Sequence, residues 1–234
     1  MEGILFPRGV VEGREGLTEY RARGGYVALE KALKQLSPAQ VLQEVADSGL
    51  RGRGGAGFPT GKKWSFTAES PDTSRYVVLN GGEDEPGSKK DRLLLENLPH
   101  LVLEGVILAS YTVKASKAYL YINAAYKDAI HSMESAVAEA KQAGYAGERI
   151  LSSDFNLEIL FTPAPPNYVA GEDTAALEVI EEKKPLPRQK PPFPATAGLF
   201  GKPTAVNNVE TLANVAPIVA RGAKWYREIG RAHV

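Results

Sequence analysis

Apolar residues recur with helical spacing in the first fifty residues. Val41, Leu42 and Val45 fall on one face of the segment 38–47, and Ser37 in front of it is a favourable N-cap. The segment 26–36 has the same character, and Gly49 ends the second helix. We therefore predict an N-terminal helical segment over residues 1–48.

From residue 76 onward, short apolar runs alternate with longer helical patterns. Residues 76–79, 118–122 and 157–161 are predicted to be buried strands, and residues 101–113, 125–143, 171–182 and 207–219 to be helices. This alternation predicts an α/β domain over residues 49–230, an open Rossmann-like sheet with flanking helices, followed by a tail at 231–234. In such sheets, ligands bind beyond the carboxyl ends of the strands.

A proline-rich segment, residues 183–203, interrupts this regularity. Proline lacks a backbone N–H and fixes φ, so the segment is predicted to be an extended loop and not a helix or a central strand. Loops of this length in compact domains are usually functional or disordered.

The amino-acid composition argues against several classes of function. The 28 basic and 28 acidic residues leave no net charge to attract nucleic acid, and the longest apolar stretch is shorter than the roughly 20 residues a membrane span needs. The chain contains no cysteine, so it offers no thiolate for a disulfide or an iron–sulfur cluster. We expect a cytoplasmic protein that binds no nucleic acid, is not inserted in a membrane and holds no metal.

The segment 50–63 is a glycine-rich loop. Residues 52–57 match the pattern G-x-G-x-x-G, but a predicted helix precedes them where a dinucleotide-binding fingerprint requires a strand. A Walker A loop is excluded because Ala56 stands where its first glycine belongs and Lys63 where its Ser or Thr does. Glycines and nearby basic residues still suit an anion. From the loop alone, a flexible surface turn is an equal alternative.

Three further clusters are polar. Glu83, Asp84 and Glu85 follow the first predicted strand, where a solvated acidic turn and a ligand site are both consistent with the sequence, and the strand-end position favours the ligand site. Residues 168–174 lead into a helix whose first turn is acidic. Asn207 is predicted to cap the last helix, with Glu210 completing a capping box, although a helix N-terminus also suits a phosphate.

Four strings taken together resemble the FMN- and NADH-binding domain of the flavoprotein subunit of respiratory complex I. They are SGLRGRGGAGFPTG at 48–61, KPPFPA at 190–195, GKPT at 201–204 and NNVETL at 207–212. The resemblance covers roughly residues 25 to 230. It implies hydride transfer from NADH to FMN, with the side chains positioning the two cofactors and no catalytic nucleophile.

The resemblance also implies a cofactor-binding set. Its members are Gly52, Arg53, Gly54, Gly55, Ala56, Phe58, Lys63, Phe66, Asn80, Glu83, Asp84, Glu85, Tyr168, Gly171, Glu172, Asp173, Phe193, Val206, Asn207, Asn208 and Thr211. Phe58, Phe66 and Phe193 are implied to flank NADH. Glu85 and Asp173 are implied to position it.

The chain departs from the family pattern at several positions. Gly82 stands where the family usually has an aspartate, Asp173 where it has a second glutamate, and Ala170 where a cysteine is common. The family's iron–sulfur domain has no counterpart in these residues, so we expect a truncated form. It would pass electrons to a partner chain carrying an iron–sulfur cluster or to a diffusible acceptor, at the periphery of a membrane complex. A non-catalytic assembly subunit and a fragment with an empty cavity are the alternatives.

Overall fold

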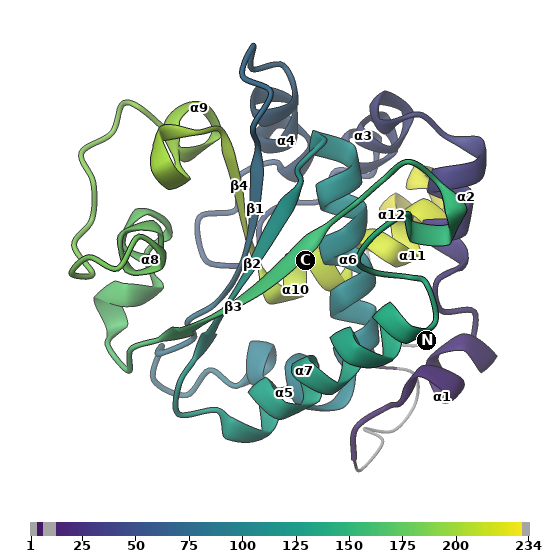
Figure 1. The fold of residues 1–234 in the computed structure, drawn as a ribbon, viewed down its shortest axis with the longest axis horizontal. Helices are drawn as coiled ribbons and strands as arrows, with labels where there is room; N and C mark the ends of the chain where they lie inside the picture. Colours follow the sequence, from purple (N-terminus) through teal and green to yellow (C-terminus); the bar gives the residue numbers. More distant parts are fainter. Residues whose placement is uncertain (1–3, 7–12, 231–234) are drawn as a thin grey trace.

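The computed structural model describes residues 4–6 and 13–230 and contains one four-stranded parallel sheet (Figure 1). Its strands are β1 (Tyr76–Gly81), β2 (Lys117–Asn123), β3 (Glu158–Ala164) and β4 (Thr204–Asn208), in the order β3-β2-β1-β4. The predicted tail at 231–234 and parts of the predicted segment 1–48 lie outside the described residues.

Helices precede, connect and follow the strands. They are α1 (Leu17–Ala22), α2 (Val27–Gln35), α3 (Pro38–Asp47), α4 (Thr60–Ala68), α5 (Lys90–Asn97), α6 (Pro99–Val113), α7 (Lys127–Gln142), α8 (Asp173–Ile180), α9 (Pro194–Ala197), α10 (Val209–Ala213), α11 (Val215–Arg221) and α12 (Ala223–Gly230). Short 3-10 turns lie at η1 (Ile150–Ser152), η2 (Tyr168–Gly171) and η3 (Leu199–Gly201).

The strand order indicates where a ligand binds. The chain moves outward from β1 to β2 and β3, then returns to place β4 on the other side of β1. All three pairings are parallel, and Asn80 of β1 is in register with Asn208 of β4. The point where the order reverses therefore lies between β1 and β4, and open α/β sheets bind ligands at such a switch point. The predicted open α/β sheet is confirmed.

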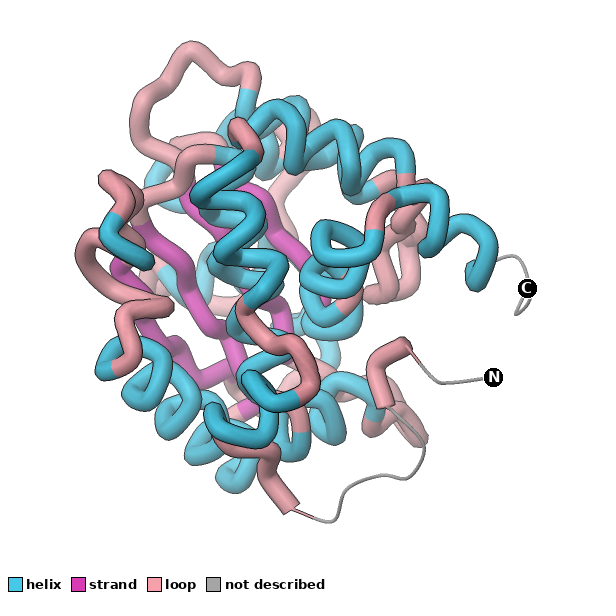
Figure 2. Tube along the Cα trace, turned by 90° about the vertical axis from the view of Figure 1, so that its right-hand side faces the viewer, coloured by secondary structure: helices cyan, strands magenta, loops and turns pink. Residues whose placement is uncertain are grey.

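Alternate residues of β1 enter two separate cores. Val77 and Leu79 belong to the larger core, to which the fully buried middle of α6 contributes, whereas Val78 packs with Leu177 of α8 and with Leu199 in the smaller one. In Figure 1, α8 lies on the left of the sheet and α6 on its right. Figure 2 shows the strands flanked by helices. Both faces of β1 are therefore covered, as parallel strands require.

A buried carboxylate fastens the N-terminal helices to this body. Glu104 of α6 accepts hydrogen bonds from the Tyr20 hydroxyl, from the Tyr26 N–H and from the Leu29 N–H, the last two at 2.9 Å. His100, one turn earlier, contacts the Tyr26 hydroxyl through Nδ1 (2.9 Å) and the Glu139 carboxylate of α7 through Nε2 (3.0 Å). These bonds satisfy polar groups that burial would otherwise leave without partners.

Three sequence-based predictions need correction. The helix predicted at 207–219 starts later, because residues 204–208 form β4, and it is divided into α10 and α11. The glycine loop ends at Pro59, so Lys62 and Lys63 lie on α4. The segment 183–203 contains α9 and η3 and is not extended throughout. Strand β4 was not predicted because its five residues directly follow the proline-rich segment that ends at Pro203.

Among the described residues, no single helix is long and apolar enough to cross a membrane; α5 and α6 reach that length and composition only as a pair bent by 100°.

Candidate functional site

The glycine loop folds against α10. Gly52 donates its N–H to the Phe58 carbonyl (2.9 Å), and the Arg53 N–H donates to Thr211 Oγ1 (2.9 Å). A Cβ added to Gly54 would lie 3.2 Å from Cβ of Asn208, which is closer than most real contacts of this kind. A side chain at position 54 would therefore press on Asn208 at the end of β4. The structure confirms that the loop precedes β1 and is no dinucleotide fingerprint, because α3 lies in front of it and α4 behind.

Helix α4 places Lys63 beside β4. Lys63 Nζ donates to the Val206 carbonyl (3.0 Å). Burial lowers the pKa of Lys63, Asp173 acts in the opposite direction, and Lys190 adds to the lowering. A largely desolvated ammonium group is a strong partner for an anion, since little water competes for it.

The two asparagines at the end of β4 have different partners. Asn207 accepts a hydrogen bond from Trp64 Nε1 (3.0 Å), so its side chain does not cap the helix as the sequence led us to predict. Asn208 is the cap, because its Oδ1 accepts from the Glu210 N–H (3.0 Å). The prediction was wrong by one residue because β4 continues through Asn207.

The end of β1 contacts the turn before α8. Asn80 Nδ2 donates to the Gly171 carbonyl (2.9 Å), and its Oδ1 accepts from the Gly82 N–H (3.1 Å). Tyr121 of the neighbouring strand donates its hydroxyl to the Ala170 carbonyl (2.9 Å). The segments around residues 80 and 170, far apart in the sequence, thus form one surface.

The acidic run after β1 has a separate contact for each carboxylate. Glu83 is 8% exposed and accepts from the N–H groups of Asp91 (3.2 Å) and Arg92 (3.1 Å), at the start of α5. Asp84 Oδ1 accepts from Asn123 Nδ2 (2.7 Å), while its Oδ2 is buried without a partner among the described residues. Glu85 is exposed.

Glu85 meets Tyr168 across the site. A hydrogen bond to the Glu85 carboxylate raises the pKa of the Tyr168 phenol, which is 65% exposed. The pair joins the loop after β1 to η2, and both side chains remain accessible to a ligand.

Two adjacent carboxylates at the start of α8 share one lysine. Glu172 caps the helix by accepting from the N–H groups of Thr174 and Ala175 (both 2.8 Å), and Lys190 Nζ lies 2.8 Å from Glu172 Oε1 and 2.6 Å from Asp173 Oδ1. Burial raises the pKa of Asp173. It also acts to raise that of Glu172, but the hydrogen bonds from Asp173, Lys190 and the helix start lower the Glu172 pKa to about 2.

The three phenylalanines of the predicted set are exposed. Phe58 lies in the glycine loop, Phe66 on α4 and Phe193 just before α9, with 41%, 46% and 59% of their surface accessible. Helices α4 and α9 contact each other. Large aromatic side chains left accessible next to a polar site suit the flat face of a heterocycle.

Several residues of this region escaped prediction. Asp91 is only 3% exposed and contacts Lys90 and Asn208, and Asn123 holds the Asp84 carboxylate. Asp91 lies on α5, which periodicity did not predict because its first turn is polar. The run of polar residues directly after a strand end was the available signal.

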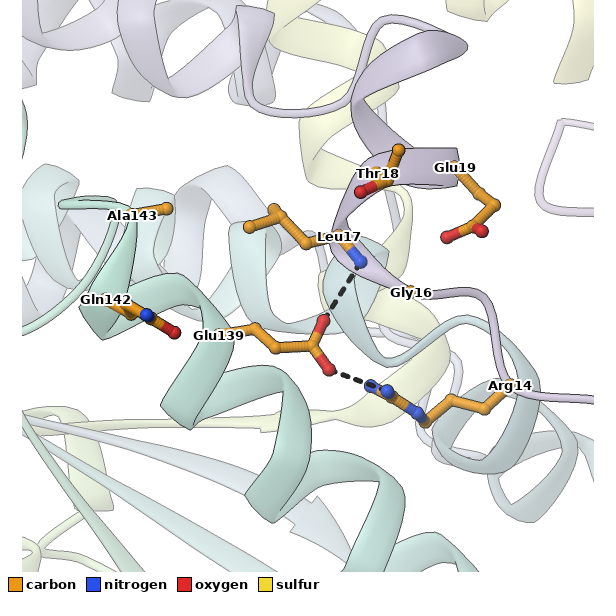
Figure 3. Close-up of a pocket in the computed structure, with 8 residues that line it drawn as sticks. All are labelled: Arg14, Gly16, Leu17, Thr18, Glu19, Glu139, Gln142 and Ala143. Carbon is orange, nitrogen blue, oxygen red and sulfur yellow. Dashed lines mark hydrogen bonds and ion pairs between the residues drawn. The ribbon is translucent and has the colours of Figure 1, made fainter.

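A separate cavity of about 360 Å³ lies between α1 and α7 (Figure 3). In it, Glu139 accepts from Arg14 Nη2 (2.6 Å) and from the Leu17 N–H (3.0 Å). None of the predicted cofactor-binding residues lines this cavity. In the part of the chain that the structure describes, no cluster of His, Asp or Glu is arranged to hold a metal ion.

Comparison with known proteins identifies relatives. The family described as the Nuo51 FMN-binding domain matches residues 45–217. An NADH-quinone oxidoreductase F subunit of Rhizobium meliloti is 49% identical over 214 residues, which are 92% of this chain and 51% of that protein. The F subunit of the Escherichia coli NADH-quinone oxidoreductase is 45% identical over 217 residues, again 92% of this chain and 49% of the relative. The chain thus spans about half the length of these relatives.

A solved structure has the same fold. The NAD+-reducing [NiFe]-hydrogenase in its H2-reduced state matches with a TM-score of 0.77 and 40% identity, over 91% of this chain and 36% of the hydrogenase chain.

Proposed function

The chain belongs to the Nuo51 FMN-binding domain family, and from this premise we propose that it binds FMN and oxidises NADH by hydride transfer to the flavin. The observation that carries the proposal is the convergence of the loop 52–54, Lys63, Asn80 and Gly171 at the switch point between β1 and β4. In this proposal, residues 49–230 form the FMN/NADH-binding domain, and residues 1–48 are a helical lead-in.

The side chains fit the phosphate and ribityl ends of FMN. Lys63 supplies a partly buried ammonium, and the glycines of the loop 52–54 carry no side chain that would keep a ligand away from the backbone. The unpartnered Asp84 Oδ2 is a ready acceptor for a hydroxyl or ring N–H. The remaining members of the predicted set complete the proposed walls: Gly55, Ala56, Glu83, Tyr168, Glu172, Val206, Asn207, Asn208 and Thr211.

The NADH site is proposed at the exposed aromatic rings. Phe58, Phe66 and Phe193 would flank the base of the nucleotide and exclude water from one of its faces, while Glu85 and Asp173 position it through hydrogen bonds. FMN, once bound, supplies the hydride acceptor. The protein contributes orientation, and no side chain needs to form a covalent bond to the substrate.

Electrons are proposed to leave to a partner chain with an iron–sulfur cluster or to a diffusible acceptor. The 234 residues include no cysteine, so the thiolates of any cluster come from elsewhere. By analogy with the subunits that it resembles, we place the protein at the periphery of a membrane complex, on the cytoplasmic side.

The visible spectrum of the protein tests this function. Protein incubated with excess FMN and then desalted should retain about one flavin per chain, and anaerobic NADH should bleach the flavin absorbance within seconds. A desalted protein without flavin absorbance contradicts the proposal.

A non-catalytic FMN-binding subunit is the second candidate. Gly82, where the family has a carboxylate, is the observation that favours it. This candidate predicts stoichiometric flavin that NADH does not bleach.

A further inference from the structure

Asp91 is a buried carboxylate that contacts Asn208 at the end of β4. It lies at the second position of α5, and only 3% of its surface is accessible. Its Oδ1 accepts from Lys90 Nζ (2.6 Å), and its Oδ2 accepts from Asn208 Nδ2 (2.5 Å). Burying an unpaired charge at this position would be energetically unfavourable, so the hydrogen-bond partners of Asp91 indicate its role.

The partners of Asp91 lead to the glycine loop. Lys90 Nζ also donates to Asn208 Oδ1 (3.2 Å), so Lys90 and Asp91 hold the two ends of the same amide. With its nitrogen turned toward Asp91, Asn208 presents its oxygen to the Glu210 N–H and its Cβ to Gly54. Exchanging the two ends of the amide would place an NH2 group against the Glu210 donor. Asp91 therefore supplies the acceptor for the Asn208 NH2 group, while Lys90 and the Glu210 N–H supply the donors for its oxygen.

We propose that Asp91 is a positioning residue of the FMN site, whose ionised carboxylate fixes Asn208 and Lys90 against the loop 53–54. The inference rests on the proposed function, because it assigns a role toward a bound flavin. The interactions involved are the ion pair between Lys90 and Asp91 and the hydrogen bonds that these two residues make to the Asn208 amide. Asp91 itself makes no bond to the flavin.

The groups around Asp91 predict that FMN binding depends on pH. The charged groups around the carboxyl are Lys90 from its own helix, Glu83 from the loop after β1 and Glu210 from α10, which is 3.2 Å from Lys90. Burial raises the pKa of Asp91 to about 6, with Glu83 adding to the rise and Lys90 opposing it. Protonation below that pH removes the charged acceptor and releases the amide.

The test is FMN binding by the wild-type chain and by Asp91→Asn at two pH values. At pH 7.5, the variant is expected to bind FMN about tenfold more weakly, the effect of about one charge-assisted hydrogen bond. At pH 5, where the wild-type carboxyl is protonated, the ratio of the two dissociation constants should approach one. The FMN phosphate titrates in the same range, but it affects both proteins equally and cancels in the ratio.

The matched control is Glu96→Gln on the same helix, which removes a surface ion pair with Arg92 and leaves Asn208 untouched. Its affinity for FMN should equal that of the wild type at both pH values. A ratio for Asp91→Asn that is the same at pH 5 and pH 7.5, or equal to one at both, overturns the inference while FMN binding stands. Failure of the wild-type chain to bind FMN overturns the proposed function as well.

Discussion

Gly171 lies directly against the backbone of Gly82. A Cβ added to Gly171 would be 2.5 Å from the Gly82 carbonyl oxygen, a distance that requires one of the two backbones to move. Around this contact, Asn80 Nδ2 bonds the Gly171 carbonyl and Asn80 Oδ1 bonds the Gly82 N–H. The loop after β1 and the turn before α8 are therefore fixed to each other by direct backbone contact and by the side chain of Asn80.

The substitution Gly171→Ala should separate these segments. We expect a loss of about 1–3 kcal/mol in the free energy of unfolding, typical of overpacking, and at least a tenfold loss of FMN affinity. Urea denaturation and fluorescence titration with FMN measure the two effects.

Gly82→Ala is the matched control. Its Cβ would meet a ring carbon of Tyr121 at 3.0 Å and no other atom closer than 3.4 Å, so it presses on one side chain, whereas Gly171→Ala presses on the backbone. Flavin affinity close to wild type is expected here. Equal losses in the two variants would show that the Gly171–Gly82 contact is not what matters.

Sequence alone predicted most of the fold but only part of the site. Strands β1, β2 and β3 each contain a short apolar run, and they were found because these runs leave a direct trace in the sequence, although β3, at the edge of the sheet, is less buried than predicted. Strand β4 was missed because its five residues follow Pro203 and end in two asparagines. Pairing with β1 stabilises it, and pairing is a tertiary property that no local pattern contains.

The candidate site was likewise predicted only in part. The family resemblance implied roles for Lys63 and Asn80, but not the contacts that define them, since Asn80 bonds a residue 91 positions away. Glu83 was predicted to be a cofactor-binding residue, and the structure shows both its carboxylate oxygens accepting from the start of α5. The role of Glu83 toward flavin stays a prediction.

Lys63 is expected to contribute charge to FMN binding. Lys63→Met removes the partly buried ammonium that bonds the Val206 carbonyl of β4, and FMN affinity should fall about 10- to 100-fold, as for a lost hydrogen bond to a charged group. Because burial already disfavours the charged form, the stability of the flavin-free protein should not fall by a similar amount. Lys62→Met, the exposed neighbour on α4, should leave the affinity within about twofold. Similar losses in both variants would point to general electrostatic attraction.

Arg188 holds the proline-rich segment that carries Phe193. It donates to the Gly198 carbonyl (2.7 Å) and to Glu181 Oε1 (2.8 Å), and it forms an ion pair with Glu178. Arg188→Gln should free this segment and raise the KM for NADH about tenfold with little change in FMN affinity, since misplacing a positioning group is costly. Steady-state NADH–ferricyanide kinetics on the flavin-loaded protein measure KM.

Lys184→Gln, an exposed change in the same segment, is the control for Arg188 and should leave KM unchanged. If Arg188→Gln lost FMN and NADH affinity in equal measure, Arg188 would act on the whole domain and not on the segment around Phe193.

Glu104 should be the most sensitive position for stability. Glu104→Gln places an NH2 group among three donors, from Tyr20, Tyr26 and Leu29, and leaves at least one of them without an acceptor. We expect a loss of roughly 2–4 kcal/mol in the free energy of unfolding and faster hydrogen exchange in α1 and α2. Glu30→Gln, which removes an exposed ion pair with Lys34, should cost less than about 0.5 kcal/mol. A stable Glu104→Gln variant would mean that the N-terminal helices are held by apolar packing alone.

Asp91 is expected to reduce the stability of the flavin-free protein at neutral pH. Its pKa is raised from 3.8 to about 6, so the folded state binds this proton more tightly than the unfolded chain does. The stability that the residue contributes is therefore highest below pH 3.8 and is lost as the pH rises through about 6. At pH 7.5 the ionised carboxyl costs on the order of 3 kcal/mol.

Asp91→Asn removes the charge that burial disfavours, at the expense of one of the two acceptor oxygens, and we expect the loss of the charge to have the larger effect. The flavin-free variant should melt at a higher temperature than the wild type at pH 7.5, and the difference should shrink toward pH 4. Thermal unfolding at several pH values measures it, with Glu96→Gln on the same helix expected to follow the wild-type curve. A gain in stability accompanied by a loss of FMN affinity is what a residue retained for ligand positioning produces. A loss of stability at pH 7.5 would instead make Asp91 a structural member of the α5–α10 contact.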